Sequence, residues 1–480
     1  MSSNIASSSI SRRTKIVCTI GPATSSAAAI KDLMQAGMDV ARINFSHGTH
    51  KEHAIKIKTL RKVAKQLGLP LAIMQDLPGP KDRTGKLKDG VVELKNNAYV
   101  VLTTKQIIGD EHQISIGLRD LPKSVKPGDS IFLADGTIEL RVVSTTKTDI
   151  KCQIIDGGIL GEDKGVNVPS VNLSTPSITK EDWGHLSFGL KHKVDFVALS
   201  FIRQAQDILK VKRFFRQRAA APAIIAKIER REALDNLDEI LEIADGIMVA
   251  RGDLGVEIPI QKVPLAQKTI IQKCNSLGKP VIVATQMLES MVDSPTPTRA
   301  EATDVANAIF DGTDALMLSA ETAIGNYAKE AVIMMSQIAL EAETALPYEE
   351  ILASKGKDLQ PQTDDAISYA ACHTAQQLGA AAIIAFTSSG STARRVAKYR
   401  PRVPILAITS SQITQRQLSL SWGVRAFKVP DASRISDLFA QGAKVAKAIG
   451  LAGKGDLIVI TGGVPVGVSG STNLLKVEMI

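Results

Sequence analysis

The chain has 480 residues, which is too long for one compact core and is typical of about two to four domains. Apolar residues make up 44% of the chain but aromatic residues only 4%, so aliphatic side chains must fill its cores. The 58 lysines and arginines exceed the 49 acidic residues to give a net charge of +9. They are spread along the chain without basic runs between aromatic residues, which argues against a nucleic-acid partner and suits small anionic substrates equally well.

Eight short runs rich in β-branched residues alternate with longer helical patterns over most of the chain. Polar or glycine-containing residues and then an amphipathic helix, such as Gln206–Arg218 or Val263–Leu277, follow most of them. Eight successive strand–helix units predict an α/β fold, a TIM (β/α)8 barrel. The runs are Lys15–Ile20, Val40–Phe45, Leu71–Gln75, Phe196–Phe201, Ile224–Ile228, Gly246–Ala250, Val281–Ala284 and Ala315–Leu318.

The alternation is interrupted between the third and fourth runs. From Gln75 to Phe196 the helical pattern disappears, and turns such as Pro127–Gly128–Asp129 separate short Val/Ile/Thr runs. This pattern predicts an all-β domain inserted into the barrel, with hinges near Gly79–Pro80 and Leu173–Pro176. The predicted boundaries are 1–79 and 176–345 for the barrel domain and 80–175 for the insertion.

A second α/β pattern begins after residue 345. Its short apolar runs again alternate with helical segments, which predicts a smaller C-terminal α/β domain with an open sheet over residues 346–480. The strands are expected at Ala382–Phe386, Ile405–Ile408, Arg425–Lys428 and Leu457–Thr461.

The carboxyl ends of barrel strands carry function in TIM barrels, so we consider the residues found there. At the second strand, the two-residue period places Arg42, Asn44 and Ser46 on one face, with Ile43 and Phe45 opposite. A cation beside two neutral oxygen ligands suits a phosphate next to a metal ion. A polar strand end capped by the next helix is the competing interpretation of this segment alone.

The fifth and sixth strands end in charged residues. Lys227 and Glu229 are two residues apart, so both face the barrel interior, where they are costly unless they pair or hold a metal. Asp253 lies beyond the sixth strand, between Gly252 and Gly255, where the backbone can approach an anion closely. Asp253 and Glu229 could therefore share one Mg²⁺. A buried salt bridge and a simple aspartate turn are the alternatives.

The seventh and eighth strands each bring a hydroxyl group to the barrel mouth, from Thr285 and Ser319. Serine and threonine also cap helices, so these two positions are weak signals on their own. Because a helix is expected just after the segment Ser319–Thr322, we predict a capping role there as well.

Five segments, present in one chain and in order, resemble the signature blocks of pyruvate kinases. The resemblance covers essentially the whole chain, including the inserted and C-terminal domains. It implies an allosteric glycolytic enzyme that transfers a phosphoryl group from phosphoenolpyruvate to ADP, giving pyruvate and ATP. The segments are Lys15–Pro22, Ala41–Gly48, Ala226–Glu229, Met248–Glu257 and Ala284–Met291.

The resemblance also implies roles for individual residues. Lys227 would stabilise the enolate left when phosphoenolpyruvate loses its phosphoryl group. Glu229 and Asp253 would hold Mg²⁺, or Mn²⁺ in its place. The inserted domain would act as a lid that excludes water.

Further matches concern substrate and nucleotide binding. Gly252, Asp253 and Thr285 match the site for the substrate carboxylate, and Thr285, or Ser319 through water, would help to protonate the enolate. Arg42 and Arg83 match cations on the transferring phosphoryl group. The residues that match the nucleotide site are Asn44, Phe45, Ser46, His47 and Arg83.

The segment after the third strand departs from the family pattern, which often contains Asp-Thr-Lys-Gly-Pro-Glu-Ile-Arg. Here Leu77 replaces the threonine that helps to hold K⁺, and Lys81 replaces the glutamate. We hypothesise that the Lys81 ammonium substitutes for K⁺, so that activity needs no monovalent cation. The sequence leaves open whether some K⁺ still binds at Asn44, Ser46, Asp76 and Leu77.

A hydroxyl-rich loop in the C-terminal domain precedes an expected helix, a pattern that favours a phosphate nest. It matches the family's allosteric phosphate loop, with an unliganded helix N-cap as the alternative. The last loop, 462–472, lacks the tryptophan and arginine of many members activated by fructose 1,6-bisphosphate, so we expect a sugar monophosphate or AMP. The loop residues are Thr387, Ser388, Ser389, Gly390, Ser391 and Thr392.

Several features bear on location and assembly. The four cysteines are far apart without a CxxC pair, which indicates neither a metal knuckle nor a disulfide framework and favours a reducing compartment. Residues 1–13 lack the apolar core of a secretory signal, and no apolar run reaches the ~18 residues that span a bilayer. We therefore expect a cytoplasmic protein without membrane contact, and the resemblance suggests a homotetramer.

Two other classes of function compete with this interpretation. One is another Mg²⁺-dependent barrel enzyme that forms an enolate, such as an oxo-acid aldolase or a mutase that uses phosphoenolpyruvate. The other is a non-catalytic sensor of phosphorylated metabolites. The inserted domain and the third domain argue against the first, and the set of charged residues at the strand ends argues against the second.

Overall fold

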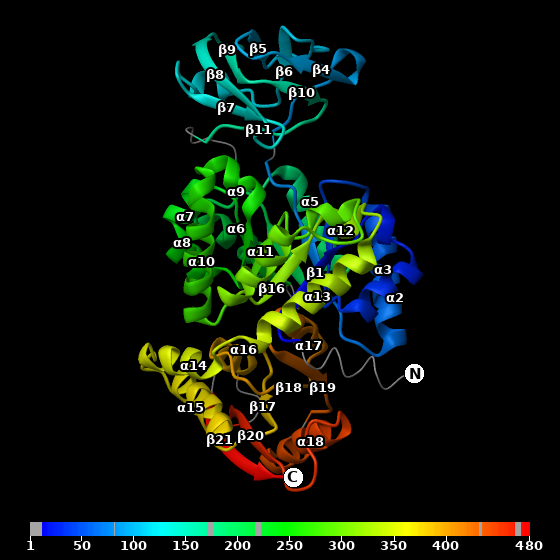
Figure 1. The fold of residues 1–480 in the computed structure, drawn as a ribbon, viewed down its shortest axis with the longest axis vertical. Helices are drawn as coiled ribbons and strands as arrows, with labels where there is room; N and C mark the ends of the chain where they lie inside the picture. The colour runs from blue at the N-terminus through cyan, green and yellow to red at the C-terminus, as the bar shows by residue number, and fades with distance from the viewer. Residues whose placement is uncertain (1–11, 81, 170–175, 217–221, 432–433, 466–471) are drawn as a thin grey trace.

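The computed structural model describes residues 12–80, 82–169, 176–216, 222–431, 434–465 and 472–480. Three bodies are stacked along the long axis of the molecule in Figure 1. A sheet domain stands at one end, the barrel lies in the middle and an α/β domain forms the other end. Among the described residues, no helix combines the length and the apolar character needed to cross a membrane.

Eight parallel strands close into a barrel in the order β1-β16-β15-β14-β13-β12-β3-β2, as predicted. Each strand begins and ends within two residues of its predicted bounds. Aliphatic side chains on the outer face of the strands form a continuous core with the surrounding helices. The strands are β1 (Lys15–Thr19), β2 (Val40–Asn44), β3 (Ala72–Asp76), β12 (Phe196–Leu199), β13 (Ala223–Ile228), β14 (Gly246–Ala250), β15 (Val281–Ala284) and β16 (Ala315–Leu318).

Helices surround the barrel, and the two predicted as examples are present as α6 and α10. Local signals in the sequence set their ends. Helix α3, for example, begins with a capping box between Thr49 and Glu52 and ends at Gly68, whose φ of +65° suits glycine. The helices are α2 (Ala27–Ala36), α3 (His50–Leu67), α5 (Lys180–Lys191), α6 (Ala205–Arg216), α7 (Arg231–Asp235), α8 (Leu237–Ile243), α9 (Arg251–Glu257), α10 (Val263–Leu277), α11 (Arg299–Phe310), α12 (Ala320–Ala323) and α13 (Ala328–Thr344).

Between β3 and β12 the chain first forms the sheets of the inserted domain, with the short helix α4 (Leu121–Ser124), and then the barrel helix α5. The expectation that no helix lies between Gln75 and Phe196 is therefore wrong for α5, and the predicted second hinge falls mostly outside the described residues. One sheet has the order β11-β7-β8-β9-β5-β6, and β10 pairs with β4 in a second. These sheets enclose an aliphatic core of their own. The strands are β4 (Val91–Leu94), β5 (Tyr99–Thr103), β6 (Gln113–Ser115), β7 (Ser130–Leu133), β8 (Ile138–Thr145), β9 (Asp149–Asp156), β10 (Gly158–Gly161) and β11 (Val166–Asn167).

The C-terminal sheet has the order β19-β18-β17-β20-β21. The four predicted strands are β17 (Ala382–Phe386), β18 (Ile405–Thr409), β19 (Val424–Lys428) and β20 (Leu457–Gly463). The sequence did not predict β21 (Thr472–Met479), which pairs antiparallel with β20. It follows β20 without an intervening helix, so the strand–helix alternation could not reveal it. The helices are α14 (Tyr348–Lys357), α15 (Thr363–Gln377), α16 (Ser391–Lys398), α17 (Gln412–Gln417) and α18 (Ile435–Ala448).

The C-terminal domain packs against the amino ends of the barrel strands. Arg416 Nε lies 2.6 Å from a carboxylate oxygen of Asp195, which directly precedes β12. Arg400 Nη1 lies 3.1 Å from Asp314 Oδ1, just before β16. The carboxyl ends of the strands therefore face the inserted domain, where Gly136 packs closely against Val256 of α9.

Candidate functional site

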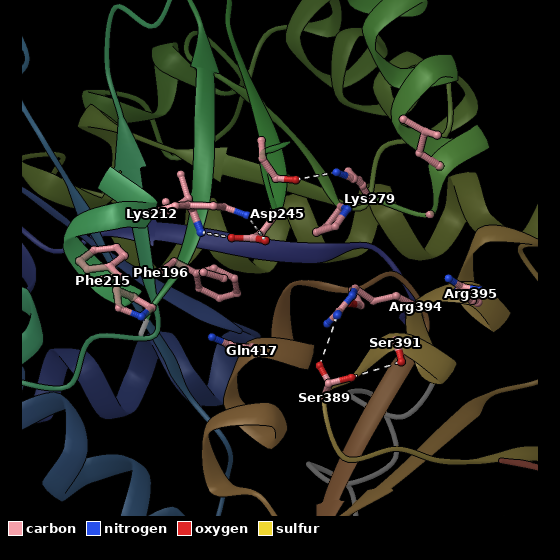
Figure 2. Close-up of a pocket in the computed structure, with 18 of the residues that line it drawn as sticks. Phe196, Lys212, Phe215, Asp245, Lys279, Ser389, Ser391, Arg394, Arg395 and Gln417 are labelled. Carbon is pink, nitrogen blue, oxygen red and sulfur yellow. Dashed lines mark hydrogen bonds and ion pairs between the residues drawn. The ribbon is translucent and has the colours of Figure 1, made fainter. Parts of the chain in front are cut away.

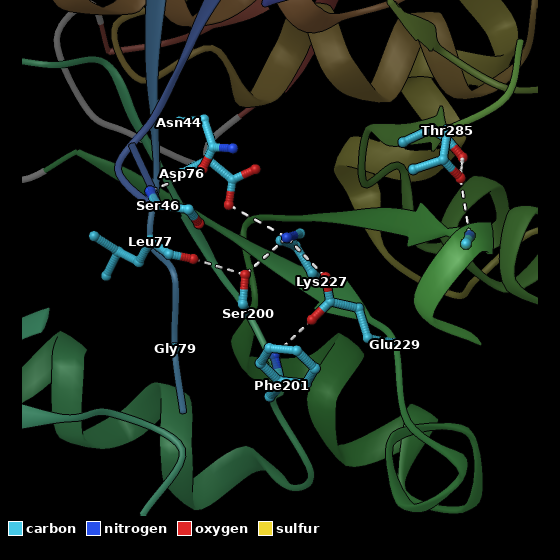
Figure 3. A network of polar contacts seen from close by, with 12 residues as sticks. Asn44, Ser46, Asp76, Leu77, Gly79, Ser200, Phe201, Lys227, Glu229 and Thr285 are labelled. Atoms are coloured by element: carbon cyan, nitrogen blue, oxygen red, sulfur yellow. Dashed lines mark hydrogen bonds and ion pairs between the residues drawn. The ribbon is translucent and has the colours of Figure 1, made fainter. Parts of the chain in front are cut away.

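A buried cluster of charged side chains lies at the carboxyl ends of the barrel strands (Figure 3). The ammonium nitrogen of Lys227 is 2.7 Å from Glu229 Oε1 and 3.3 Å from Asp76 Oδ1. It also donates a hydrogen bond to Ser200 Oγ at 2.7 Å. Lys227 is only 8% exposed, and the two carboxylates are each 1% exposed. The predicted placement of Lys227 and Glu229 in the barrel interior is therefore confirmed.

Asp76, at the end of β3, links this lysine to the second strand. Its Oδ2 lies 2.6 Å from Arg42 Nε, and Arg42 Nη1 donates to Thr19 Oγ1 at 3.0 Å. Burial favours the neutral form of Asp76, but the charges of Lys227 and Arg42 outweigh it and hold its pKa below the usual value. Asp76 is therefore an anion shared by two cations.

The ionisation of Lys227 follows from the same contacts. Burial alone would lower its pKa, but the charges of Asp76 and Glu229 outweigh burial and raise it above the usual value. Lys227 is consequently a permanent cation.

Glu229 has the opposite balance. Burial raises its pKa, and the charge of Asp253 adds to the effect of burial while Lys227 opposes it. One oxygen accepts a hydrogen bond from the Phe201 backbone at 2.7 Å. The other oxygen lies 2.7 Å from the Lys227 ammonium, and Asp76 Oδ1 lies 3.3 Å from the same group.

These features fit a divalent cation near Glu229 and Asp253. The charge of Asp253 raises the pKa of Glu229, so the two carboxylates are near enough to repel each other, as two ligands of one cation would. Within the described part of the chain, no three His, Cys, Asp or Glu side chains gather closely enough to hold a metal. The remaining ligands would be water or substrate oxygens, as Mg²⁺ prefers.

The turns after β14 and β15 meet, as predicted for Gly252 and Thr285. The backbone N–H of Gly252 donates to Thr285 Oγ1 at 2.9 Å, at the start of α9. Thr285 has φ of +72°, which is strained for a β-branched residue. Arg251 holds this turn, because its Nη2 donates to the Thr285 carbonyl oxygen at 2.7 Å while its Nη1 lies 2.7 Å from Asp304.

The predicted capping role after β16 is wrong. Ser319 precedes α12, but its side chain makes no capping hydrogen bond to the helix. Its φ and ψ of −107° and −94° differ from the extended backbone of a usual N-cap residue. Instead, Glu321 accepts hydrogen bonds from the backbone N–H groups of Ser319 and Leu288, at 2.7 and 3.1 Å.

The loop after β2 confirms the predicted alternation of faces. Arg42, Asn44 and Ser46 are half-buried and alternate with two fully buried residues. Asn44 Oδ1 accepts a hydrogen bond from the Ser46 backbone at 3.0 Å. Phe45 points to the other side, where its ring stacks on His53 with centroids 4.1 Å apart. Phe45 is thus a core residue, whereas the neighbouring His47 is exposed.

Arg83 is not brought together with Lys227 and Arg42. Its Nη1 donates to the carbonyl oxygen of Asp163 at 2.7 Å, so the side chain contacts the inserted domain. Its neighbour Asp82 is partly buried, which raises the pKa of that carboxyl to about 6, against the charge of Arg230.

The predicted K⁺ positions are partly occupied by protein contacts. The Leu77 side chain is buried in the aliphatic core, and its carbonyl oxygen accepts a hydrogen bond from Ser200 at 2.7 Å. Both carboxylate oxygens of Asp76 face cations of the protein itself. Lys81, the predicted substitute for K⁺, lies outside the described residues.

The hydroxyl-rich loop of the C-terminal domain does precede a helix, α16. Gly390 has φ of +88° and donates its N–H to Thr387 Oγ1 at 2.9 Å. The Ser388 carbonyl oxygen accepts a hydrogen bond from Thr414, and Thr392 is hydrogen-bonded to Thr472. No side chain caps the amino end of α16.

Sequence reasoning missed Ser200 and Thr19. Ser200 receives a hydrogen bond from Lys227 and donates one to Leu77, and so connects the ends of β3, β12 and β13. Both residues stand at or just beyond a strand end, which is the signal that could have found them. A single hydroxyl there is too common to be singled out without the contact.

Comparison with known proteins gives matches over nearly the whole chain. The sequence profile "Pyruvate kinase, barrel domain" matches residues 11–332, and "Pyruvate kinase, alpha/beta domain" matches residues 365–478. A pyruvate kinase of Geobacillus stearothermophilus is 49% identical over 472 residues, which cover 98% of this chain and 80% of the relative. A pyruvate kinase of Staphylococcus aureus (strain MRSA252) is 47% identical over 471 residues, with the same coverage.

We expect Lys227→Met to lower the free energy of unfolding by about 3–5 kcal/mol near neutral pH, because the buried Glu229 loses its cation and Asp76 keeps only Arg42. Without Lys227 the folded pKa of Glu229, which burial already raises, should exceed the unfolded value of about 4. Protonation of Glu229 then restores stability as the pH falls, so the loss should shrink towards about pH 5. Thermal unfolding with a chelator present measures this effect.

The matched control is Lys273→Met, which removes an exposed cation paired with Asp238. It should cost less than about 1 kcal/mol at either pH. A loss in Lys227→Met that is the same at both pH values would contradict the charge balance described above.

Proposed function

The chain belongs to the pyruvate kinase family and transfers a phosphoryl group from phosphoenolpyruvate to ADP, and we propose that the cluster around Lys227 is where this transfer occurs. The observation that carries the proposal is a buried ammonium group held between Asp76 and Glu229 at the carboxyl ends of the barrel strands. Neither alternative, another enolate-forming barrel enzyme or a non-catalytic sensor, finds support in the matches.

In this proposal Lys227 stabilises the enolate oxygen as the phosphoryl group leaves. A permanent cation fixed by several contacts need not reorganise when negative charge develops, which is how such groups lower a barrier. Arg42 faces the transferring phosphoryl group, because its guanidinium lies beside Asp76 on the same inner face of the barrel. Thr285, or Ser319 through water, supplies the proton that the enolate then needs.

Glu229 and Asp253 are the residues that would hold Mg²⁺, with Mn²⁺ as a substitute of similar ligand preference. When bound, the ion would supply a Lewis acid for substrate oxygens. Gly252, Asp253 and Thr285 would bind the substrate carboxylate. The start of α9 supports this role, since helix N-termini attract anions.

The nucleotide would bind at the loop after β2, through Asn44, Phe45, Ser46 and His47, together with Arg83. Arg83 contacts the inserted domain, so we propose that lid movement carries its side chain towards the phosphates. A cleft of about 530 Å³ separates α9 from the inserted domain, with Phe132 and Gly136 on one wall. Closure of this cleft would exclude water from the transfer.

The wider context of the enzyme belongs to the same proposal. The segment Thr387–Thr392 would bind the phosphate of an allosteric effector, a sugar monophosphate or AMP. We propose that the protein forms a homotetramer and works in the cytoplasm. We also propose that its domain boundaries lie near residues 80, 175 and 346.

Lys227→Met is the experiment that tests the function. We expect turnover in a coupled assay with ADP and phosphoenolpyruvate to fall by at least about 10³-fold, because transition-state charge loses its cation. Phosphoenolpyruvate binding, measured by titration calorimetry, should be nearly unchanged. Lys273→Met is again the control, and turnover by Lys227→Met near that of the unmodified chain would refute the role of Lys227.

We expect Ser200→Ala to lower kcat by about 10–100-fold with little change in KM, as is typical when a supporting contact to a reactive group is lost. Ser200→Thr keeps the hydroxyl group and should retain more activity than the alanine variant. A purely structural role would instead lower thermal stability in step with kcat. Steady-state kinetics and melting curves of the two variants separate these outcomes.

Activity in buffer without K⁺, with tetramethylammonium as the counter-ion, tests the cation hypothesis. If the Lys81 ammonium replaces K⁺, turnover should be close to its value with added KCl. Lys81→Glu should then require K⁺, because a carboxylate takes the place of the ammonium. A large stimulation of the unmodified chain by KCl would reject the hypothesis.

A further inference from the structure

Aromatic rings gather where α3 and α5 meet the loop that follows β2. Four of the seven histidines of the chain take part, and neighbouring ring centroids are 4.1–6.1 Å apart. The loop carries the proposed nucleotide residues, so these histidines lie next to a functional segment to which they do not belong. The rings are those of Phe45, His50, His53, His185, Phe188 and His192.

His53 lies beneath the loop and contacts it on both sides of the central nucleotide residues. Its ring stacks on Phe45 with centroids 4.1 Å apart. A Cβ atom at Gly48 would lie 3.3 Å from His53 Cε1, so the backbone of Gly48 passes close to the same ring. Ser46 and His47 lie between these two contacts in the chain. One imidazole therefore supports both ends of the segment that presents them.

No polar group compensates for the burial of His53. The residue is 1% exposed, and neither ring nitrogen has a hydrogen bond to any described residue. A charged imidazolium would lose its water there without gaining an acceptor. Burial accordingly lowers the pKa of His53 to about 4, and the charges of Lys56, His50 and His185 act in the same direction. Only the charge of Glu52 opposes them, so the ring is neutral near pH 7 while the loop keeps this shape.

The pair formed by His50 and His185 has the same preference. His50 Nε2 and His185 Nδ1 are 2.8 Å apart, so one nitrogen donates a hydrogen bond and the other must accept it. Two charged rings would bring two N–H groups face to face and break this bond. Burial and then the charge of His50 lower the pKa of His185, although Glu181 opposes them. The cluster as a whole therefore favours uncharged rings.

We propose that His53 is a positioning residue for nucleotide binding, which holds the loop after β2 in its binding shape only as an uncharged ring. Acidification would then weaken the binding of ADP by loosening the loop. This inference rests on the proposed function, because it takes the segment 44–47 to be part of the nucleotide site. It adds a residue that acts from beneath the loop, through its contacts with Phe45 and Gly48.

The direction of the effect follows from proton binding. In a loosened loop the histidine would regain a pKa near the usual value of about 6.5, whereas the ordered loop holds the pKa of His53 at about 4. The ordered loop thus binds fewer protons, so its advantage is complete above about pH 6.5 and is lost as the pH falls towards about 4. These two values shift the ordering equilibrium by up to about tenfold between about pH 7.5 and 5.5.

Steady-state kinetics of the full chain at about pH 7.5 and 5.5 test the proposal. The KM for ADP should rise in the unmodified chain by up to about tenfold more than in His53→Phe, because phenylalanine keeps the stack on Phe45 but cannot titrate. Comparing the two proteins cancels the titration of ADP itself, which both share. The KM for phosphoenolpyruvate and kcat should change alike in both, which a merely structural role would not predict. His112→Phe, at a strongly exposed position, should behave like the unmodified chain.

His50→Gln provides the test if His53→Phe does not fold. His50 is exposed at the first position of α3, and glutamine can still hydrogen-bond to His185. The substitution removes a charge that lowers the pKa of His53. The rise in the KM for ADP at low pH should therefore again be smaller than in the unmodified chain.

Effector binding has to be kept out of this assay. The proposed effector loop borders a cavity at the amino ends of the barrel strands, with Phe196 on one wall and Ser389 and Arg394 on the other (Figure 2). No histidine lines this cavity among the described residues, but phosphate esters themselves titrate near pH 6. The buffers therefore contain no phosphate, and the substrates are the only phosphate esters added.

An equal change in the KM for ADP in the unmodified chain and in the folded variants of His53 and His50 would overturn the inference. His47→Ala separates that result from a failure of the proposed function. If the loop binds the nucleotide, His47→Ala should raise the KM for ADP at both pH values. An unchanged KM in His47→Ala would instead count against the proposed nucleotide site.

Discussion

The ammonium of Lys227 is the charge on which the rest of the site depends. With Arg42 it balances Asp76 and Glu229, so two cations and two carboxylates cancel within a buried region. The negative charge of Asp253 then raises the pKa of Glu229, in addition to the larger effect of burial. Glu229 and Asp253 therefore bring two carboxylates to the same side of the site. A divalent cation that arrives with an anionic substrate suits such a site.

The fold supports this balance through short strands held at both ends. The two-residue period of β13 points Lys227 and Glu229 inward, while Ser200 connects Lys227 to the end of β3. At the amino ends, Asp195 binds Arg61 and Arg416, both at 2.6 Å. Few atoms of the cluster can therefore move independently of the barrel, which preorganises the charges before substrate binds.

The sequence predicted the parts of this arrangement that depend on periodicity. The eight strands and the inward direction of Arg42, Lys227 and Glu229 follow from local patterns. Contacts between strands do not follow from such patterns, which is why Ser200 was missed and why the hydrogen bond from Arg83 to Asp163 could not be foreseen. The hydroxyl of Ser319 illustrates the limit, because a helix follows it as predicted but the side chain does not cap that helix. Strand β21 was missed because a hairpin edge carries no helical signal.

The two ends of the barrel share the same strands, and this bears on regulation. A ligand at the amino ends can alter catalysis only if it binds two arrangements of β12 and β13 with different affinity. The contacts of Asp195 and Asp314 with Arg416 and Arg400 define one such arrangement, in which the C-terminal domain is held against the barrel. Since Ser200 and Lys227 stand on or next to those strands, the reacting end would respond without direct contact between ligand and substrate.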